Sequence, residues 1–130
     1  MYVYPVIFTP LEEQEGFCIY APDFKGCITE ARIIAEGITK IREGLCGMLY
    51  MLERDKKEVP KPTDIRLVEH GKDDFITLVD VPLDEYRKRV GYKAVRRTIS
   101  IPEWLDALAI NANISLSQIT QEALRTKLNV

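Results

Sequence analysis

The most informative stretch of the chain is Arg96–Leu128, RRTISIPEWLDALAINANISLSQITQEALRTKL, in its C-terminal part. Its first residues alternate between polar and apolar side chains, which predicts a strand over 96–101. Pro102 is favoured in the first turn of a helix, so we expect a helix to follow it. Ser115 can cap a second helix over about 116–128. The stretch is therefore predicted to form one strand followed by two helices.

Such a stretch cannot close a domain by itself. A lone strand leaves backbone groups unpaired on both sides, and about 35 residues bury too small a core to be stable. Pairing the strands of two copies into a ribbon beneath four helices removes both difficulties. We therefore expect a homodimer with a shared apolar core. Its predicted residues, from the strand and both helices, are Ile99, Ile101, Trp104, Leu105, Leu108, Ile119 and Leu124.

This order of elements, within Arg96–Leu128, resembles the ribbon-helix-helix family, whose β-ribbon enters the major groove of DNA. The resemblance implies that the outward residues Arg96, Thr98 and Ser100 read base edges, where arginine can bond guanine through two hydrogen bonds. Free amide groups at the start of the second helix suit a phosphate, and further basic residues precede the strand. The predicted phosphate-binding residues are Ser115, Leu116, Ser117, Arg97 and Lys93, with the Arg87–Arg89 stretch as a further candidate.

The formal net charge of −2 hides an asymmetry between the two parts of the chain. Residues 1–85 contain 10 Lys and Arg and 17 Asp and Glu, a net charge of −7, whereas residues 86–130 contain 8 and 3, a net charge of +5. A basic module suits nucleic acid, and an acidic module suits a basic protein. We predict an N-terminal domain over 1–82, a basic linker over 83–94 and a DNA-binding domain over 95–130.

The N-terminal domain is predicted to be β-β-α-β-β, so the chain as a whole is expected to be α+β. Apolar residues at gaps of three and four predict a long helix from Thr29 to about Arg54. Gly37, Gly44 and Gly47 each weaken a helix interior, unless they permit close packing. Residues 82–91 are either a short helix or a linker. The predicted strands, rich in β-branched and aromatic residues, are 1–8, 17–21, 64–69 and 75–81.

The stretch Tyr4–Thr29, YPVIFTPLEEQEGFCIYAPDFKGCIT, resembles the N-terminal domain of HicB antitoxins, and the resemblance continues into the long helix. Its most specific parts are the opening Tyr-Pro-Val, the Gly-Phe before the second strand and the corner at Pro22–Thr29. Together with the C-terminal segment, the resemblance covers nearly the whole chain. The chain departs from the family at 30–32, where Glu-Ala-Arg replaces the usual Gly-Asp or Gly-Glu, so no toxin-contacting residue is assigned.

The resemblance implies a specific biology. The N-terminal domain would be a degenerate RNase H-like fold that covers the active site of a HicA toxin, a small basic RNA-cleaving protein. The C-terminal domain would bind the double-stranded operator of the shared operon and repress it. The acidic charge of residues 1–85 agrees, because a protein that competes for an RNA-binding surface should be acidic.

Two other functions have different requirements from an antitoxin. A ribbon-helix-helix regulator that senses a small molecule needs a pocket between sheet and helix, and the three helix glycines hint at space there. A nuclease needs carboxylates that converge on Mg²⁺. Asp23, Glu12 and Glu13 are available, but the centre of the first predicted strand carries no acidic residue. Cys27 is more typical of a packed cysteine than of a nucleophile. We expect no enzymatic activity and assign no catalytic residue.

Composition also bears on metal binding, redox compartment and membrane contact. The single histidine, His70, makes a histidine-based zinc site unlikely to form, and we expect neither metal nor cofactor. Cys18, Cys27 and Cys46 lack CxxC spacing and fit a reducing cytosol. No apolar run reaches the ~18 residues of a membrane span, and the first ten residues do not resemble a signal peptide. We therefore expect a cytoplasmic protein without membrane contact, and a tetramer stays open if Tyr2–Phe8 is an exposed edge.

Overall fold

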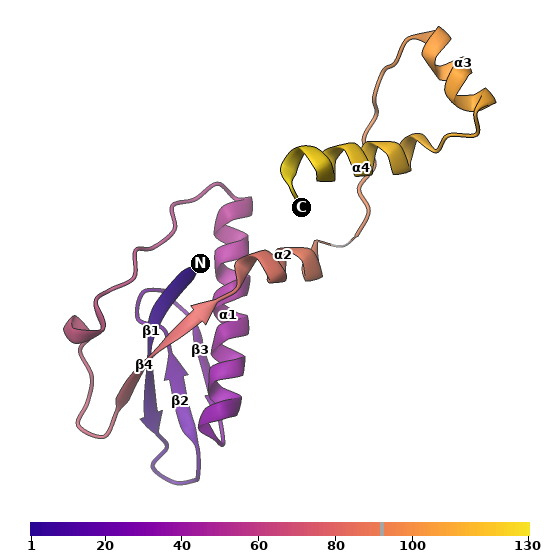
Figure 1. Ribbon diagram of the computed structural model, residues 1–130. Helices are drawn as coiled ribbons and strands as arrows, with labels where there is room; N and C mark the ends of the chain where they lie inside the picture. The colour runs from indigo at the N-terminus through magenta and orange to yellow at the C-terminus, as the bar shows by residue number, and fades with distance from the viewer. Residues whose placement is uncertain (92) are drawn as a thin grey trace. The chain divides into compact units, whose positions relative to one another are not determined.

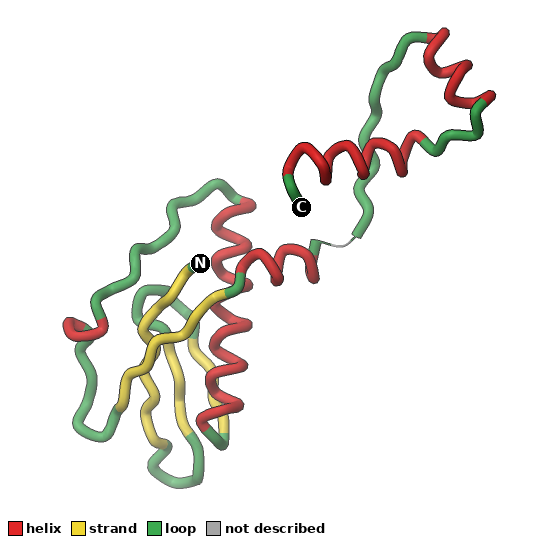
Figure 2. Tube along the Cα trace, viewed as in Figure 1, coloured by secondary structure: helices red, strands yellow, loops and turns green. Residues whose placement is uncertain are grey.

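The computed structural model describes residues 1–91 and 93–130 and separates into two compact units, Met1–Lys93 and Ala94–Val130. Strands and helices both contribute, so the predicted α+β class is confirmed (Figure 1, Figure 2). In chain order the elements are β1 (Tyr2–Pro10), β2 (Phe17–Tyr20), β3 (Ile28–Ala31), α1 (Ile34–Arg54), the 3-10 turn η1 (Ile65–Leu67), β4 (Phe75–Val81), α2 (Leu83–Val90), α3 (Glu103–Asn111) and α4 (Leu116–Leu128).

Within the described residues, the strands form one four-stranded antiparallel sheet in the order β3-β2-β1-β4. β1 pairs with β4 from Tyr2 to Phe8 and with β2 from Ile7 to Pro10. β1 is therefore an inner strand of the sheet, although β2 reaches only as far as Ile7, and the expectation that Tyr2–Phe8 forms an exposed edge of the sheet is wrong. The two edges of the sheet are β3 and β4.

The predicted order β-β-α-β-β is also wrong, because a third strand precedes the long helix. Thr29 does not cap α1 but pairs with Ile19 of β2, as its β-branched side chain favours. The strand predicted over 64–69 is instead the turn η1. Its Asp64 side chain accepts hydrogen bonds from the Arg66 amide at 2.9 Å and from the Arg66 guanidinium at 2.6 and 3.0 Å, and such local bonds favour a turn over a ladder.

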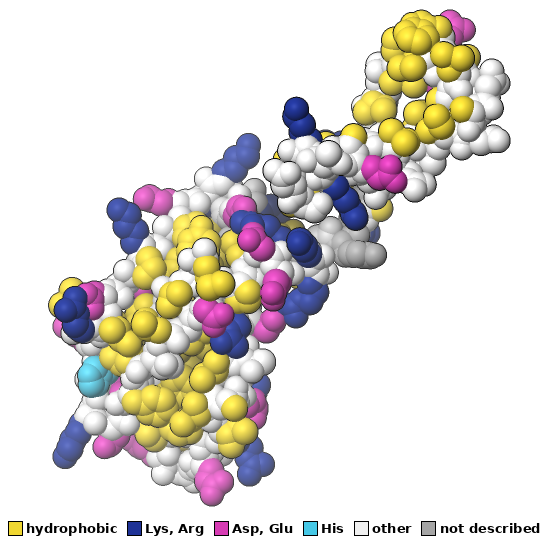
Figure 3. All heavy atoms as spheres, viewed as in Figure 1, with side chains coloured by type: hydrophobic (Ala, Val, Ile, Leu, Met, Phe, Trp, Pro, Cys, Tyr) yellow, Lys and Arg dark blue, Asp and Glu magenta, His cyan; other side chains and the backbone are white. Residues whose placement is uncertain are grey.

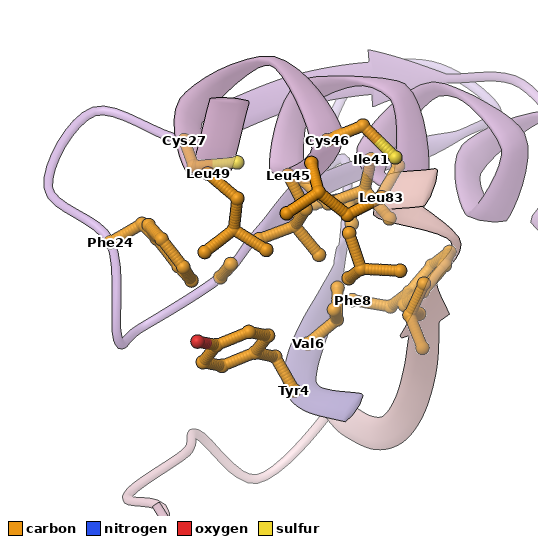
Figure 4. Close-up of a cluster of buried hydrophobic side chains, with 14 of the residues drawn as sticks. Tyr4, Val6, Phe8, Phe24, Cys27, Ile41, Leu45, Cys46, Leu49 and Leu83 are labelled. Atoms are coloured by element: carbon orange, nitrogen blue, oxygen red, sulfur yellow. The ribbon is translucent and has the colours of Figure 1, made fainter. Parts of the chain in front are cut away.

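The core lies between α1 and one face of the sheet (Figure 4). The apolar stripe of α1 supplies Ile41, Leu45 and Leu49, which pack onto β1 side chains such as Phe8. Tyr4 is also fully buried, and its hydroxyl donates to the Pro60 carbonyl at 2.7 Å, which satisfies its polar atom. Desolvation by burial, together with nearby Tyr2 and Asp23, raises the pKa of Tyr4 to about 12.

Gly37 sets how closely α1 approaches the sheet. A Cβ atom there would lie 2.8 Å from Cδ1 of Ile19 and 2.9 Å from Cε2 of Phe8, which is closer than real contacts allow. At Gly44 the nearest atom to such a Cβ is Sγ of Cys27 at 3.5 Å, an ordinary contact. Gly37 therefore serves close packing, and it does not open space for a ligand between helix and sheet.

Residues 82–91, which the sequence left as a helix or a linker, contain α2 and lie in the N-terminal unit. Leu83 is buried in the core cluster. The Arg87 guanidinium donates to both carboxylate oxygens of Glu53 at 2.8 and 2.9 Å, and Arg89 donates to Glu43 at 2.5 Å. The basic run that was predicted as the start of a linker over 83–94 is thus a helix docked on α1.

The two helix glycines give a matched pair of substitutions. We expect Gly44→Ala to raise the free energy of unfolding by about 0.5–1 kcal/mol, because alanine stabilises a helix interior and the site has room. Gly37→Ala should lower it by about 1–3 kcal/mol, because the methyl group overlaps Phe8 and Ile19. Urea unfolding followed by circular dichroism measures both. A stabilising effect at both positions would mean that the helix–sheet interface has room for a methyl group at Gly37.

Candidate nucleic-acid interface

The C-terminal unit begins with a segment that has no ladder partner in the chain. Residues 94–102 belong to no helix or strand of the described residues, although the alternation over 96–101 is that of a strand. A strand is defined by its hydrogen bonds to a neighbouring strand. A segment with strand-like alternation therefore forms no strand in a single chain that offers it no partner. The predicted strand is therefore neither confirmed nor replaced by another element.

The two helices that follow are built as the sequence predicted. α3 begins directly after Pro102, and Ser115 caps α4 by accepting a hydrogen bond from the Gln118 amide at 3.3 Å. Between the helices, Asn113 adopts the left-handed conformation with φ 55°, which asparagine tolerates better than most residues. Asn129, with φ 59°, ends α4 in the same way.

The apolar side chains of this unit have no core in a single chain. Across the described residues of Ala94–Val130, none is buried, and Figure 3 shows hydrophobic side chains gathered over α3. Apolar surface on this scale marks an interaction site. Of the predicted dimer-core residues, Ile101 is half-buried, and the others are between 42% and 65% exposed: Ile99, Trp104, Leu105, Leu108, Ile119 and Leu124.

The polar residues of the predicted strand are accessible to a ligand. Lys93, Arg96, Arg97, Thr98 and Ser100 are all exposed. The ion pairs among the described residues include neither Arg96 nor Arg97, so both guanidinium groups are available to a polyanion. Their charges therefore belong to the surface of the segment rather than to its packing.

Two basic residues of α2 are already engaged in ion pairs. Arg87 and Arg89, which the sequence offered as additional phosphate contacts, are held by carboxylates of α1, as described above. Hydrogen bonding to Glu53 raises the pKa of Arg87, and hydrogen bonding to Glu43 does the same for Arg89. These two cations are committed within the N-terminal unit.

The start of α4 offers backbone donors. The first amides of a helix have no partner inside it and carry the positive end of its dipole. The Ser115 hydroxyl occupies one donor, the Gln118 amide. The Ser117 hydroxyl accepts from the Gln121 side chain at 3.3 Å, and Leu116 and Ser117 are exposed. The hydrogen bonds of the described residues do not connect this helix start with Arg96, Thr98 or Ser100.

Asp23, Cys27 and His70 lie in three separate structural settings. The Asp23 carboxylate accepts hydrogen bonds from the amide of Thr63, at 3.0 Å, and from its hydroxyl, which fixes the loop after α1. Cys27 is buried, and burial raises the pKa of its thiol. His70 is exposed at a turn. Across residues 1–91 and 93–130, no three His, Cys, Asp or Glu side chains are grouped so as to hold a metal ion. Among the helices described, none has the length and apolar character that crossing a membrane requires.

Comparison with known proteins gives a consistent result. A family model described as a HicB-like antitoxin of bacterial toxin–antitoxin systems matches residues 4–124. A chain of the toxin–antitoxin complex from Streptococcus pneumoniae is 24% identical, with a TM-score of 0.62 over 97% of this chain and 98% of that chain. The antitoxin HicB of Burkholderia pseudomallei is 20% identical, with a TM-score of 0.56 over 95% and 96% of the two chains. These similarities to solved structures show a common fold. No curated protein sequence matches the chain.

The apolar face of the C-terminal unit gives a prediction with an internal control. Trp104 and Ile110 lie on α3 and are both 65% exposed, but only Trp104 belongs to the predicted dimer core. We expect Trp104→Ala to destabilise a dimer by about 3–5 kcal/mol, because it removes a large buried side chain. Ile110→Ala should cost less than about 1 kcal/mol. Sedimentation equilibrium gives both dissociation constants, and equal losses would show that the predicted face is wrong.

Proposed function

The chain belongs to the HicB-like antitoxins of bacterial toxin–antitoxin systems, and from this premise we propose that it neutralises a HicA-type mRNA interferase and represses its own operon. The match of the family model over residues 4–124 is the observation that carries the antitoxin function. The division of labour between the two units is our inference from their surfaces. In this proposal the N-terminal unit covers the toxin's active site, and the C-terminal unit binds operator DNA.

The charge of the N-terminal unit supports its role in neutralisation. Residues 1–85 carry a net charge of −7, so the unit can compete with RNA for a basic surface. We propose that its sheet and α1 are a degenerate RNase H-like domain without the nuclease activity of a working one. The bonds that hold Asp23 to Thr63 support this, because they engage a carboxylate that a metal-dependent nuclease would need.

The incomplete strand pairing and packing of the C-terminal unit support a role in DNA binding. Its segment 96–101 has the alternation of a strand, and its helices expose the side chains of a core. A second copy supplies both missing partners, and the result is a homodimeric ribbon-helix-helix domain. In this dimer Arg96, Thr98 and Ser100 face the base edges of the operator. Phosphates are bound by Ser115, Leu116, Ser117, Arg97 and Lys93.

We place the protein in the cytoplasm. The thiols of Cys18, Cys27 and Cys46 are unpaired in the part of the chain that the structure describes. Unpaired cysteines of this kind suit a reducing compartment. Operator DNA and an RNA-cleaving toxin are also found there, so the setting agrees with both proposed partners.

Neutralisation can be tested in growing cells. We expect expression of the small basic reading frame next to this gene to stop growth, and co-expression of the full chain to restore it. Residues 1–93, a compact unit of the structure, should restore growth without the C-terminal unit. Colony counts and growth curves measure the effect. A harmless neighbouring protein, or rescue that needs residues 94–130, would contradict the proposed division of labour.

DNA reading can be tested at Arg96. Arg96→Ala should weaken binding to the operator by about 1–3 kcal/mol and relax the preference for one base pair, because a guanine loses a bidentate partner. Arg125→Ala, in the last turn of α4, removes the same charge away from the predicted reading face and is the matched control. Fluorescence anisotropy with the DNA upstream of the operon measures both affinities. An unchanged sequence preference in Arg96→Ala would remove this residue from the reading face.

A further inference from the structure

We propose that the outer edge of β3, with the cleft beside it, binds an extended, positively charged segment of the toxin as an added strand. The proposal rests on the antitoxin function proposed above and identifies the surface that binds the toxin. It follows from three features of this edge: backbone groups that face away from the sheet, carboxylates around the cleft and exposed isoleucines along the rim.

The hydrogen bonds of β3 identify its outward groups. The Cys27 carbonyl accepts from the Ala21 amide at 3.0 Å, so Cys27 and every second residue after it face β2. The Glu30 carbonyl instead accepts from Nζ of Lys40 on α1 at 3.0 Å, which places it on the other side of the strand. Ile28 and Glu30 therefore direct their backbone N–H and C=O groups away from β2. An extended segment can pair with such an edge through main-chain hydrogen bonds.

The cleft beside this edge is acidic. It is formed by the hairpin that connects β1 and β2, by the end of β3 and by the first turns of α1. Lys40, on its α1 side, is already engaged by Glu36 at 2.9 Å and by the Glu30 carbonyl. Glu15 and Glu30 make no ion pair with any described residue. Arg32 also lines the cleft and belongs to none of the ion pairs of the described residues. With Glu12 and Glu13 of the hairpin, the carboxylates still outnumber the two cations, Arg32 and Lys40.

The charge of the cleft selects the occupant. A second copy of this chain would bring the same carboxylates to the interface and would be repelled. A lysine- or arginine-rich segment gains Coulomb attraction and can replace Lys40 at the Glu30 carbonyl. The family is one of antitoxins, so the expected partner is a toxin. A basic segment of that toxin can pair with the β3 edge and is attracted by the carboxylates of the cleft.

Exposed apolar side chains complete the surface. Ile28 on β3 is 62% exposed, and Ile33, in the connection to α1, is 60% exposed. Apolar residues surrounded by charged ones are typical of a protein interface, in which the apolar part excludes water and the rim gives specificity. On the opposite edge Arg42 of α1 likewise donates to an outward carbonyl, that of Asp80 on β4, at 3.2 Å. The difference is that Arg42 also binds the Asp80 carboxylate at 2.8 Å, whereas Glu30 makes no ion pair with a described residue.

The backbone contribution can be tested with proline. Glu30→Pro removes an outward N–H and leaves the ladder to β2 intact, since the bonded residues are its neighbours. Glu30→Ala removes the carboxylate but keeps this N–H. We expect Glu30→Pro to weaken toxin binding at least about tenfold more than Glu30→Ala, as measured by isothermal titration of the full chain with purified toxin.

A proline on the other edge is the matched control. Because the Asp80 carbonyl faces outward on β4, Leu78 does too, and Leu78→Pro removes an outward N–H there. Leu78→Pro should leave toxin binding unchanged. If it weakens binding as much as Glu30→Pro, the effect reflects the integrity of the sheet and the proposal is overturned. Thermal melting of each variant confirms that the sheet has formed.

Charge reversal tests the field independently of the backbone. The double variant Glu15→Lys and Glu30→Lys should weaken toxin binding by about tenfold or more and reduce its dependence on salt. Glu58→Lys with Asp73→Lys makes the same change in net charge on the exposed loop between α1 and β4 and should bind as the natural chain does. Equal losses in the two double variants would mean that only overall charge matters, and they would overturn the proposal.

The two levels of the hypothesis fail in different ways. If the natural chain neither binds nor neutralises the toxin, the proposed function is wrong, and this surface is wrong with it. If the natural chain binds and the Glu30→Pro and charge-reversed variants bind equally well, the antitoxin function stands and the β3 edge is not its docking surface.

Discussion

The need to pair every backbone N–H and C=O group organises both units of this protein. In the N-terminal unit, the sheet meets most of this need, because β4 pairs with β1 along Tyr2–Phe8, β2 pairs with it along Ile7–Pro10, and α1 covers one face. In the C-terminal unit, the segment 96–101 has strand-like alternation and no partner strand in the described chain. In the dimer that we propose, a second chain supplies both the partner strand and the rest of the core, so that the two gain stability together.

The amino-acid pattern predicted those elements that depend on local sequence. The stripe from Ile41 to Leu49 identified α1, and Ser115 identified the start of α4, because periodicity and capping are local properties. β3 was missed because Ala31 continues the helical spacing of α1, while its strand character arises from pairing with residues eight to fourteen positions away. Register and strand order depend on such distant partners, which a local pattern does not contain.

The two candidate sites differ in the same way: one depends on local sequence, and the other on residues that meet only in the fold. Arg96, Thr98 and Ser100 were selected by alternation, which is visible in the sequence, and they are exposed in the structure. The β3 edge was not selected, because Glu15, Glu30 and Lys40 come from three elements and meet only in the fold. The run of glutamates in the hairpin was the one available signal, and charge without a defined neighbour does not identify a surface.

The fold also changes the meaning of the charge count. The value of +5 for residues 86–130 includes Arg87 and Arg89, which are neutralised by Glu53 and Glu43 inside the N-terminal unit. The unit 94–130 itself holds 4 Lys and Arg against 3 Asp and Glu, a net charge of only +1. A diffuse basic surface therefore does not account for the DNA binding that we propose. Two of its four cations, Arg96 and Arg97, lie on the strand-like segment, whereas all three carboxylates lie on α3 and α4. Attraction to a phosphate backbone would thus be concentrated on the segment that we propose as the reading strand. In that proposal, orientation on DNA depends on where the charge lies rather than on how much charge there is.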